Sequence, residues 1–167
     1  MQFFTAEWAF SQLDVAEADN VVERYSDHLA TFDQNGQVYR FATTVGLNDA
    51  YLDRLVVDSA AGRIDLLLLT GDVQVGYWRT TLSYGAAQIA HGQTVLARGL
   101  SSRPTEIWYD EFTSDIEGMS HAFLLAPRTR LVGTPGEFRI DFKDFSFRQV
   151  KVRGRELATS EDQSVWG

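Results

Sequence analysis

The feature that most limits how this chain can fold is the change of sequence pattern at Gly36. Before it, the segment ADNVVERYSDHLATF places Val22, Tyr25, Leu29 and Phe32 at steps of three and four, the apolar stripe of an amphipathic helix. After it come short β-rich runs separated by turn residues. Parallel strands would need helices between them. We therefore predict an α+β fold, with N-terminal helices packed on a largely antiparallel, curved β-sheet.

The N-terminal segment carries its own helix signals. Thr5 is expected to cap a first short helix, with Phe4 as an apolar anchor just outside it and Glu7 near its positive end. The sequence DQNG at residues 33–36 is expected to stop the next helix, because Asn and Gly accept positive φ at little cost.

Seven segments after this point have the composition of strands. They are QVYRFATT (37–44), YLDRLVVD (51–58), RIDLLLLT (63–70), VQVGYWRTTLSYG (73–85), TEIWYDEFTS (105–114), MSHAFLLAP (119–127) and EFRIDFKDFSFRQVKV (137–152). The second and third form a predicted hairpin closed by SAAG, where Gly62 suits the left-handed position of the turn.

The last of these segments changes phase part-way along. Its apolar side chains alternate in one phase up to Phe142 and in the opposite phase at Phe145 and Phe147. An extra residue at Lys143-Asp144 would return both sets to the core side, so we predict a β-bulge there. The alternative is a strand that is apolar on both faces.

The length of the chain, 167 residues, fits one domain. We assign residues 1–153 to a single α+β domain and residues 154–167 to a mobile C-terminal tail, because the tail is polar without a sustained period. The chain has no cysteine, which excludes disulfides, thiolate zinc sites and a cysteine nucleophile. Stability must therefore come from packing.

The charge pattern bears on location and partners. The N-terminus has no basic region typical of a signal peptide, and no uncharged stretch is long enough to span a membrane, so we expect a cytoplasmic bacterial protein. The net charge is −8, with ten acids against three bases up to residue 60. This disfavours binding to nucleic acid. An acidic surface could attract a basic protein, or simply keep the protein soluble.

Three acidic residues, Asp49, Asp110 and Glu111, are candidate catalytic residues. Asn48-Asp49 stands before a predicted strand, where both residues suit a turn, and the alternative is that Asp49 acts as an acid, base or ligand. In IWYDEF, the adjacent Asp110 and Glu111 should point to opposite faces of a strand. The inward carboxyl, beside an aromatic ring, would have a raised pKa suited to acid–base chemistry. The alternative is a strand end or an ion pair with an arginine.

Other catalytic signatures are missing from the sequence. His28, His91 and His121 lie far apart and lack the spacing of common metal motifs, so we expect no metal and no cofactor. The glycine patterns of serine hydrolases and nucleotide-binding folds do not occur either. These observations favour a protein without enzymatic activity and leave the question open.

Aromatic residues are frequent in the predicted strands. A curved sheet could use them to line a cleft, or they could simply form the core. They are Tyr77, Trp78, Tyr84, Trp108, Tyr109, Phe112, Phe123, Phe138 and Phe142.

The opening MQFFTAEWAF, together with GLNDAYLDRLVVDSAAGRIDLLLLTGD and GYWRTTLSYGAAQI, resembles a group of small uncharacterised bacterial proteins. These begin Met-x-Phe-Phe-Thr-x-Glu-Trp and carry a Leu-His-Asp-Ala motif before a β-hairpin. A similar motif occurs among immunity partners of bacterial toxins. Here Leu47, Asp49 and Ala50 match the motif, whereas Asn48 replaces its histidine. Because asparagine cannot change protonation near neutral pH, a structural role for this segment is favoured.

Three functional hypotheses follow. In the first, a non-enzymatic, immunity-like protein meets a basic protein partner through the acidic residues Glu17, Asp19, Glu23 and Asp27 of the predicted helix. The alternative is an enzyme or small-molecule-binding protein with an aromatic cleft that contains Trp78, Trp108 and Tyr109. Its acids would be Asp49, Asp110 and Glu111. The third is a homodimer that pairs through a sheet edge or an aromatic patch.

Overall fold

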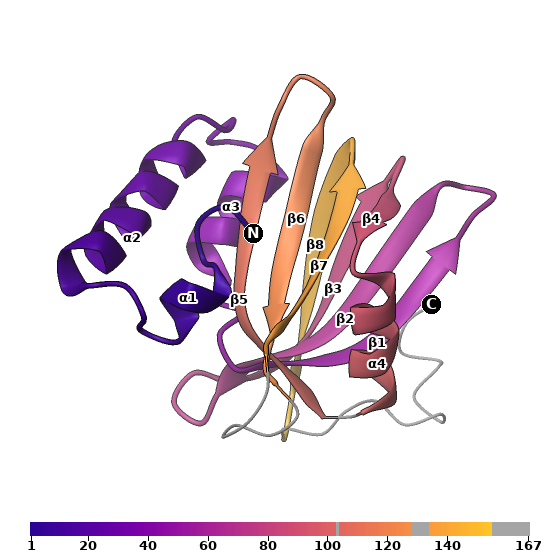
Figure 1. Cartoon of the computed structure of the whole chain (residues 1–167). Coiled ribbons are helices and arrows are strands. Elements are labelled where there is room, and N and C mark those ends of the chain that lie inside the picture. Colours follow the sequence, from indigo (N-terminus) through magenta and orange to yellow (C-terminus); the bar gives the residue numbers. More distant parts are fainter. Residues whose placement is uncertain (103, 128–133, 155–167) are drawn as a thin grey trace.

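The computed structural model describes residues 1–102, 104–127 and 134–154. It shows an α+β fold in which N-terminal helices accompany an eight-stranded antiparallel sheet that is not closed into a barrel (Figure 1). The strands are β1 (Ala50–Asp58), β2 (Arg63–Asp72), β3 (Gly76–Gly85), β4 (Gln88–His91), β5 (Thr105–Ser114), β6 (Met119–Leu125), β7 (Gly136–Phe142) and β8 (Asp144–Val152). Their order is β4-β7-β6-β5-β1-β2-β3-β8. The predicted fold class is therefore confirmed.

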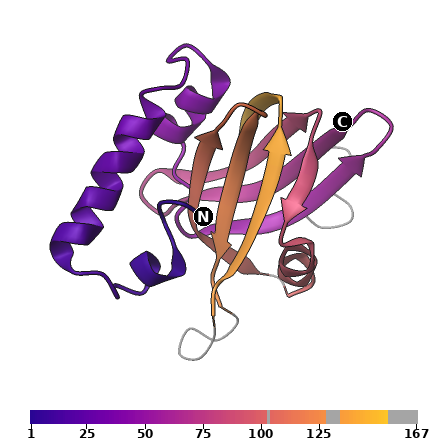
Figure 2. The same ribbon diagram turned by 45° about the horizontal axis from the view of Figure 1, so that its top comes forward.

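The sheet folds back on itself. Strands β7 and β8 are separated by Lys143 alone, yet β7 pairs with β6 and β4 while β8 pairs with β3 at the other edge. The two ends of the sheet must therefore approach each other. Figures 1 and 2 show the result as two layers, one containing β4, β7, β6 and β5 and the other β1, β2, β3 and β8. The core lies between these layers.

The change of phase around Lys143 is real, but it is not a bulge within one strand. The chain ends β7 at Phe142, crosses at Lys143 and begins β8 at Asp144 with a new partner strand. Both apolar sets do face the core, since Phe142 is buried and Phe145 packs against the core cluster. The prediction failed in its mechanism because a single sequence does not show that the strand changes partners.

The hairpin of β1 and β2 is confirmed, as is the left-handed backbone of Gly62, with φ of 61°.

The prediction of a strand over residues 37–44 is wrong, because this segment is helix α3 (Gln37–Thr44). Its β-branched residues favour a strand locally, but Val38 and Phe41 are three apart and both buried, so packing selects the helix. Gly36 caps it with φ of −73°, not the positive φ that we predicted.

Two helices precede α3. Helix α1 (Ala6–Ala9) is capped by Thr5, whose hydroxyl accepts the N–H of Trp8 at 3.3 Å, as predicted. Helix α2 (Val15–Leu29) buries Leu29 but leaves Val22 51% exposed. The apolar stripe predicted for α2 is therefore wrong at Val22, which lies one helix position away from the half-buried Val21.

Helix α4 (Gln93–Ser101) was not predicted. Helices α3 and α4 each contact one strand from each layer: α3 contacts β5 and β8, and α4 contacts β1 and β7. They therefore close two sides of the folded sheet.

None of the helices in the described residues is long and apolar enough to cross a membrane. The tail predicted at 154–167 lies, apart from Gly154, outside the described residues.

Candidate functional site

The three candidate catalytic carboxylates are not brought together at one place. Asp49 is exposed in a turn, with φ of 61°, where the N–H of Ala50 donates to the carbonyl of Leu47 at 2.9 Å. The turn predicted at Asn48-Asp49 is thus present. Asp110 and Glu111 lie next to each other on β5, and their contacts are with different parts of the molecule.

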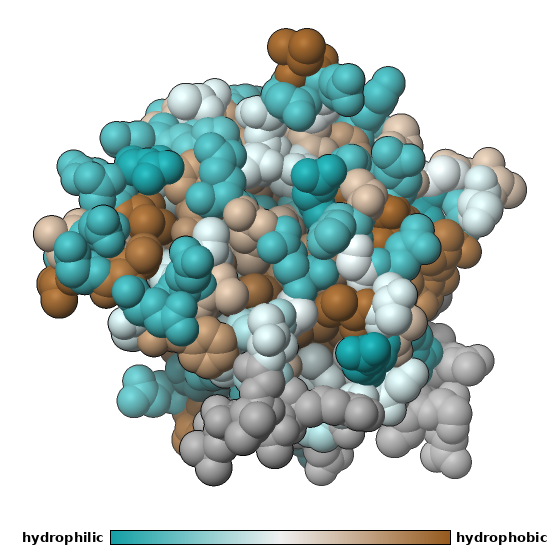
Figure 3. Space-filling view, viewed as in Figure 1, coloured by the Kyte–Doolittle hydropathy of each residue, from teal (hydrophilic) through white to brown (hydrophobic). Residues whose placement is uncertain are grey.

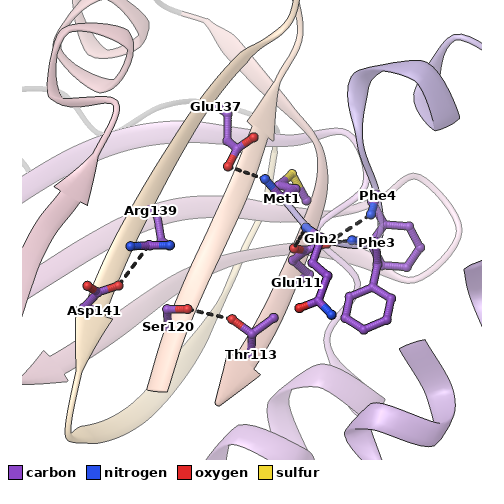
Figure 4. A network of polar contacts seen from close by, with 10 residues as sticks. All are labelled: Met1, Gln2, Phe3, Phe4, Glu111, Thr113, Ser120, Glu137, Arg139 and Asp141. Carbon is purple, nitrogen blue, oxygen red and sulfur yellow. Dashed lines mark hydrogen bonds and ion pairs between the residues drawn. The ribbon is translucent and has the colours of Figure 1, made fainter. Parts of the chain in front are cut away.

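Glu111 holds the N-terminal segment against the sheet. Its carboxylate accepts the main-chain N–H groups of Gln2, Phe3 and Phe4, the last two at 2.8 and 3.0 Å (Figure 4). The side chain is 1% exposed, so these charge-assisted bonds compensate for the loss of water around the carboxylate. The simpler prediction, a strand end or an ion pair with an arginine, is therefore wrong for Glu111, which lies within β5 and binds main-chain N–H groups.

Asp110, which is half-buried, is hydrogen-bonded in a row with two buried polar side chains. The Oδ2 atom of Asp110 lies 2.9 Å from Nε2 of His121 on β6, and Nδ1 of His121 lies 2.8 Å from the hydroxyl of Tyr84 on β3. Tyr84 and His121 are both 0% exposed. Since β3 and β6 lie in different layers, this row links the two halves of the sheet across the core.

Burial and nearby charges determine how Tyr84 and His121 are protonated in this hydrogen-bonded row. Burial lowers the pKa of His121, although its hydrogen bond to Asp110 and the charges of Asp110 and Glu111 oppose this shift. Burial also raises the pKa of Tyr84. A protonated Tyr84 must therefore donate to Nδ1 of a neutral His121, whose Nε2–H donates to Asp110. All three groups are satisfied, and the core gains a specific cross-link.

Aromatic rings surround the buried histidine. The ring of Phe112 stacks on His121 with 3.7 Å between centroids, and Phe123 lies at 4.0 Å. Both phenylalanines are 0% exposed. Of the two roles predicted for the strand aromatics, cleft lining or core, Phe112 and Phe123 therefore have the core role. His121 lies in the segment 119–127 that the sequence predicts as a strand, but its partners come from other strands and leave no local signal.

Tyr25 of α2 forms a hydrogen bond with the main chain of β5. Strand β1 pairs with β5 only at its beginning, up to Ala50 opposite Ile107. Beyond this point the hydroxyl of Tyr25 accepts the N–H of Phe112 at 2.9 Å. Burial raises the pKa of Tyr25, and the negative charge of Asp110 adds to the effect. Helix α2 is thus attached to the sheet through its inner face.

The acidic residues predicted to bind a partner lie on exposed positions of α2. They are Glu17, Asp19, Glu23 and Asp27. Arg24 of the same helix turns toward the body of the protein, where its guanidinium lies 5.8 Å from the ring centroid of Phe3.

The predicted binding aromatics are separated in the described structure. Trp78 lies on β3, where Nζ of Lys151 is 5.6 Å from its ring centroid. Trp108 and Tyr109 lie on β5 and contact rings of the N-terminal segment, Phe10 and Trp8 respectively. No ring contact between described residues joins Trp78 to the other two.

A polar groove of about 500 Å³ lies between the hairpin of β5 and β6, the end of β7 and the connection from β3 to β4, and Gln2 of the N-terminal segment also lines it. Thr113 and Ser120 share a 2.7 Å hydrogen bond there, and Arg139 pairs with Asp141 at 3.0 Å (Figure 4). Within the described residues, no group of three or more histidine, aspartate and glutamate side chains is arranged to hold a metal ion.

Comparison with known proteins adds no relative. No protein-family model matches the sequence, and neither a curated protein nor a solved structure is significantly similar to it. Functional inference for this chain therefore depends on its own residues.

Proposed function

We propose that this is a non-enzymatic binding protein whose helix α2 engages a basic protein partner. The observation that carries the proposal is the outward face of α2. Asp19, Glu23 and Asp27 follow one another at steps of four, so they form one column on the helix surface. All three are exposed, on the side away from Tyr25 and Leu29.

The column keeps its negative charge because no base of α2 neutralises it. The one arginine of this helix, Arg24, is directed to Phe3 instead. Three like charges at this spacing destabilise an isolated helix slightly, and a partner that supplies lysines or arginines would remove that cost.

Apolar side chains lie beside the acids. Val15 is 79% exposed and Val22 is 51% exposed. In Figure 3, the left side of the molecule, where α2 lies in Figure 1, mixes hydrophilic with hydrophobic residues. Such a mixture suits a protein interface, in which charge guides the encounter and apolar area contributes to affinity. The motif that Leu47, Asp49 and Ala50 share with immunity partners of bacterial toxins, and the expected cytoplasmic location, fit the same proposal.

The alternative of an enzyme would need acids that converge on a substrate. The described geometry places Asp49 in a turn and directs Asp110 and Glu111 to different partners. This arrangement favours the binding proposal over an enzyme that uses those three carboxylates.

The experiment is affinity capture from native lysate with two charge-matched variants. The variant Glu23→Gln/Asp27→Asn removes two acids from the column, while the control Glu117→Gln/Asp144→Asn removes two exposed acids elsewhere. We expect a basic protein to be captured at low salt by the wild type and the control but not by the α2 variant, and capture to weaken at about 0.15 M salt. Identical capture by all three proteins would contradict the proposal.

A further inference from the structure

A second groove lies on the outer face of the other layer, away from the core. It has a volume of about 400 Å³ and is formed by residues of β1, β2, β3 and β8. Three arginines line it, Arg54, Arg63 and Arg148, in a protein whose net charge is −8. The concentration of positive charge at this groove is therefore opposite to the character of the whole molecule.

Strand register places a single row of side chains across the groove. Arg54 pairs with Leu67, Leu67 with Thr81, and Thr81 with Arg148. Neighbouring strands lie about 4.8 Å apart, so the backbones of the two arginines are separated by about 14 Å, with Leu67 and Thr81 between them. Two guanidinium groups on long, flexible side chains can close over one small ligand at this separation.

The floor of the groove contains an unused hydrogen-bonding group. Oγ1 of Thr81 is buried and has no hydrogen-bond partner among the described residues. A buried hydroxyl without a partner costs free energy. Two serines of the next row, Ser83 and Ser146, also line the groove and are opposite each other in the register of β3 and β8.

The groove carries one carboxylate, and it is already paired. Asp65 accepts from Arg63, with contacts of 3.0 Å at Nε and 2.9 Å at NH2. Arg148 has no ion-pair partner in the described part of the chain. Among the described residues that line the groove, three are arginines and one is an aspartate.

We propose that this groove binds a small polyanion that bears phosphate or carboxylate groups. Guanidinium groups form paired hydrogen bonds with both kinds of oxyanion. Arg148 and Arg54 hold the anion from either side of the row, Arg63 contacts it at one end, and the hydroxyl of Thr81 donates to it from the floor. The site is independent of the face of α2.

The test is a titration of the full-length protein with pyrophosphate and, separately, with citrate at about 0.15 M salt, followed by amide chemical shifts in NMR spectra. We expect saturable shifts at residues of the groove. The tighter of the two probes identifies phosphate or carboxylate as the preferred group. Absence of saturable binding by both probes would overturn the proposal.

Two variants and one control separate a site from general charge attraction. Arg148→Gln should weaken binding about tenfold or more, because it removes charge-assisted hydrogen bonds. Lys151→Gln removes one charge from the same strand outside the groove and should leave affinity within about twofold. Asp65→Asn should tighten binding, because it removes the only carboxylate among the described groove residues. Equal weakening by Arg148→Gln and Lys151→Gln, or no gain from Asp65→Asn, would contradict the proposal.

Discussion

At the scale of single residues, hydrogen bonds that lead from Tyr84 through His121 to Asp110 cross the core. This row joins strands of different layers, and its two hydrogen bonds satisfy polar atoms of the buried Tyr84 and His121 side chains. The sequence showed the residue types but could not show that they are in contact, since Tyr84 and His121 are 37 residues apart. Contacts between distant strands leave no periodic signal in one sequence.

Replacing Tyr84 by phenylalanine should destabilise the protein without changing its fold. The variant leaves Nδ1 of His121 buried and without its donor, which costs about 1–3 kcal/mol in the free energy of unfolding. The measurement is urea denaturation. Tyr77→Phe on the same strand, where the side chain is only half-buried, is the matched control and should change stability by much less. Equal effects of the two variants would refute a specific role for the Tyr84 hydroxyl.

The lowered pKa of His121 predicts how stability depends on pH. A histidine whose pKa is lower in the folded state than in the unfolded state binds protons more readily when unfolded. Its contribution to stability is therefore complete above the ordinary pKa of 6.5 and is lost as the pH falls from 6.5 toward the folded value. His121→Gln should flatten the dependence of the urea midpoint on pH in this range. His91→Gln, at an exposed position, should leave the wild-type slope.

At the scale of elements, prediction succeeded where the signal was local. The Thr5 cap, the left-handed Gly62 and the turn at Asn48-Asp49 follow from the conformational preferences of the residues themselves. Prediction failed for α3, because its β-branched residues favour a strand and only the burial of Phe41 between the layers selects a helix. It also missed α4.

The connection between β4 and α4 depends on Gly92. This residue has φ of 74°, and a Cβ there would lie 2.1 Å from the carbonyl oxygen of Glu137. Gly92→Ala should therefore cost more than about 1 kcal/mol, through both backbone strain and the clash. A suitable control is Gly46→Ala, because a Cβ at Gly46 meets no atom within 4 Å. Thermal unfolding of the two variants checks this, and an unchanged melting temperature for Gly92→Ala would contradict it.

At the scale of the whole molecule, the arrangement of charge is the main functional clue. Four of the ten acids counted up to residue 60 lie on α2, which stands beside the sheet in Figure 1, while three arginines line a groove on the outer face of β1, β2, β3 and β8. The uneven charge could be read from the sequence. The sequence could not show that the acidic and basic residues lie on two separate surfaces, because their placement depends on how the sheet folds back on itself between β7 and β8.

The most direct test of the proposed function is photo-crosslinking in native cells from the outward face of α2. A photoreactive amino acid at Asn20, next to Asp19 and on the exposed side of the helix, would be compared with one at the exposed Gln74 in the turn between β2 and β3. The account predicts one discrete adduct with a basic protein from position 20 and none from position 74. No adduct at position 20, or the same adducts at both positions, would contradict a partner site on α2.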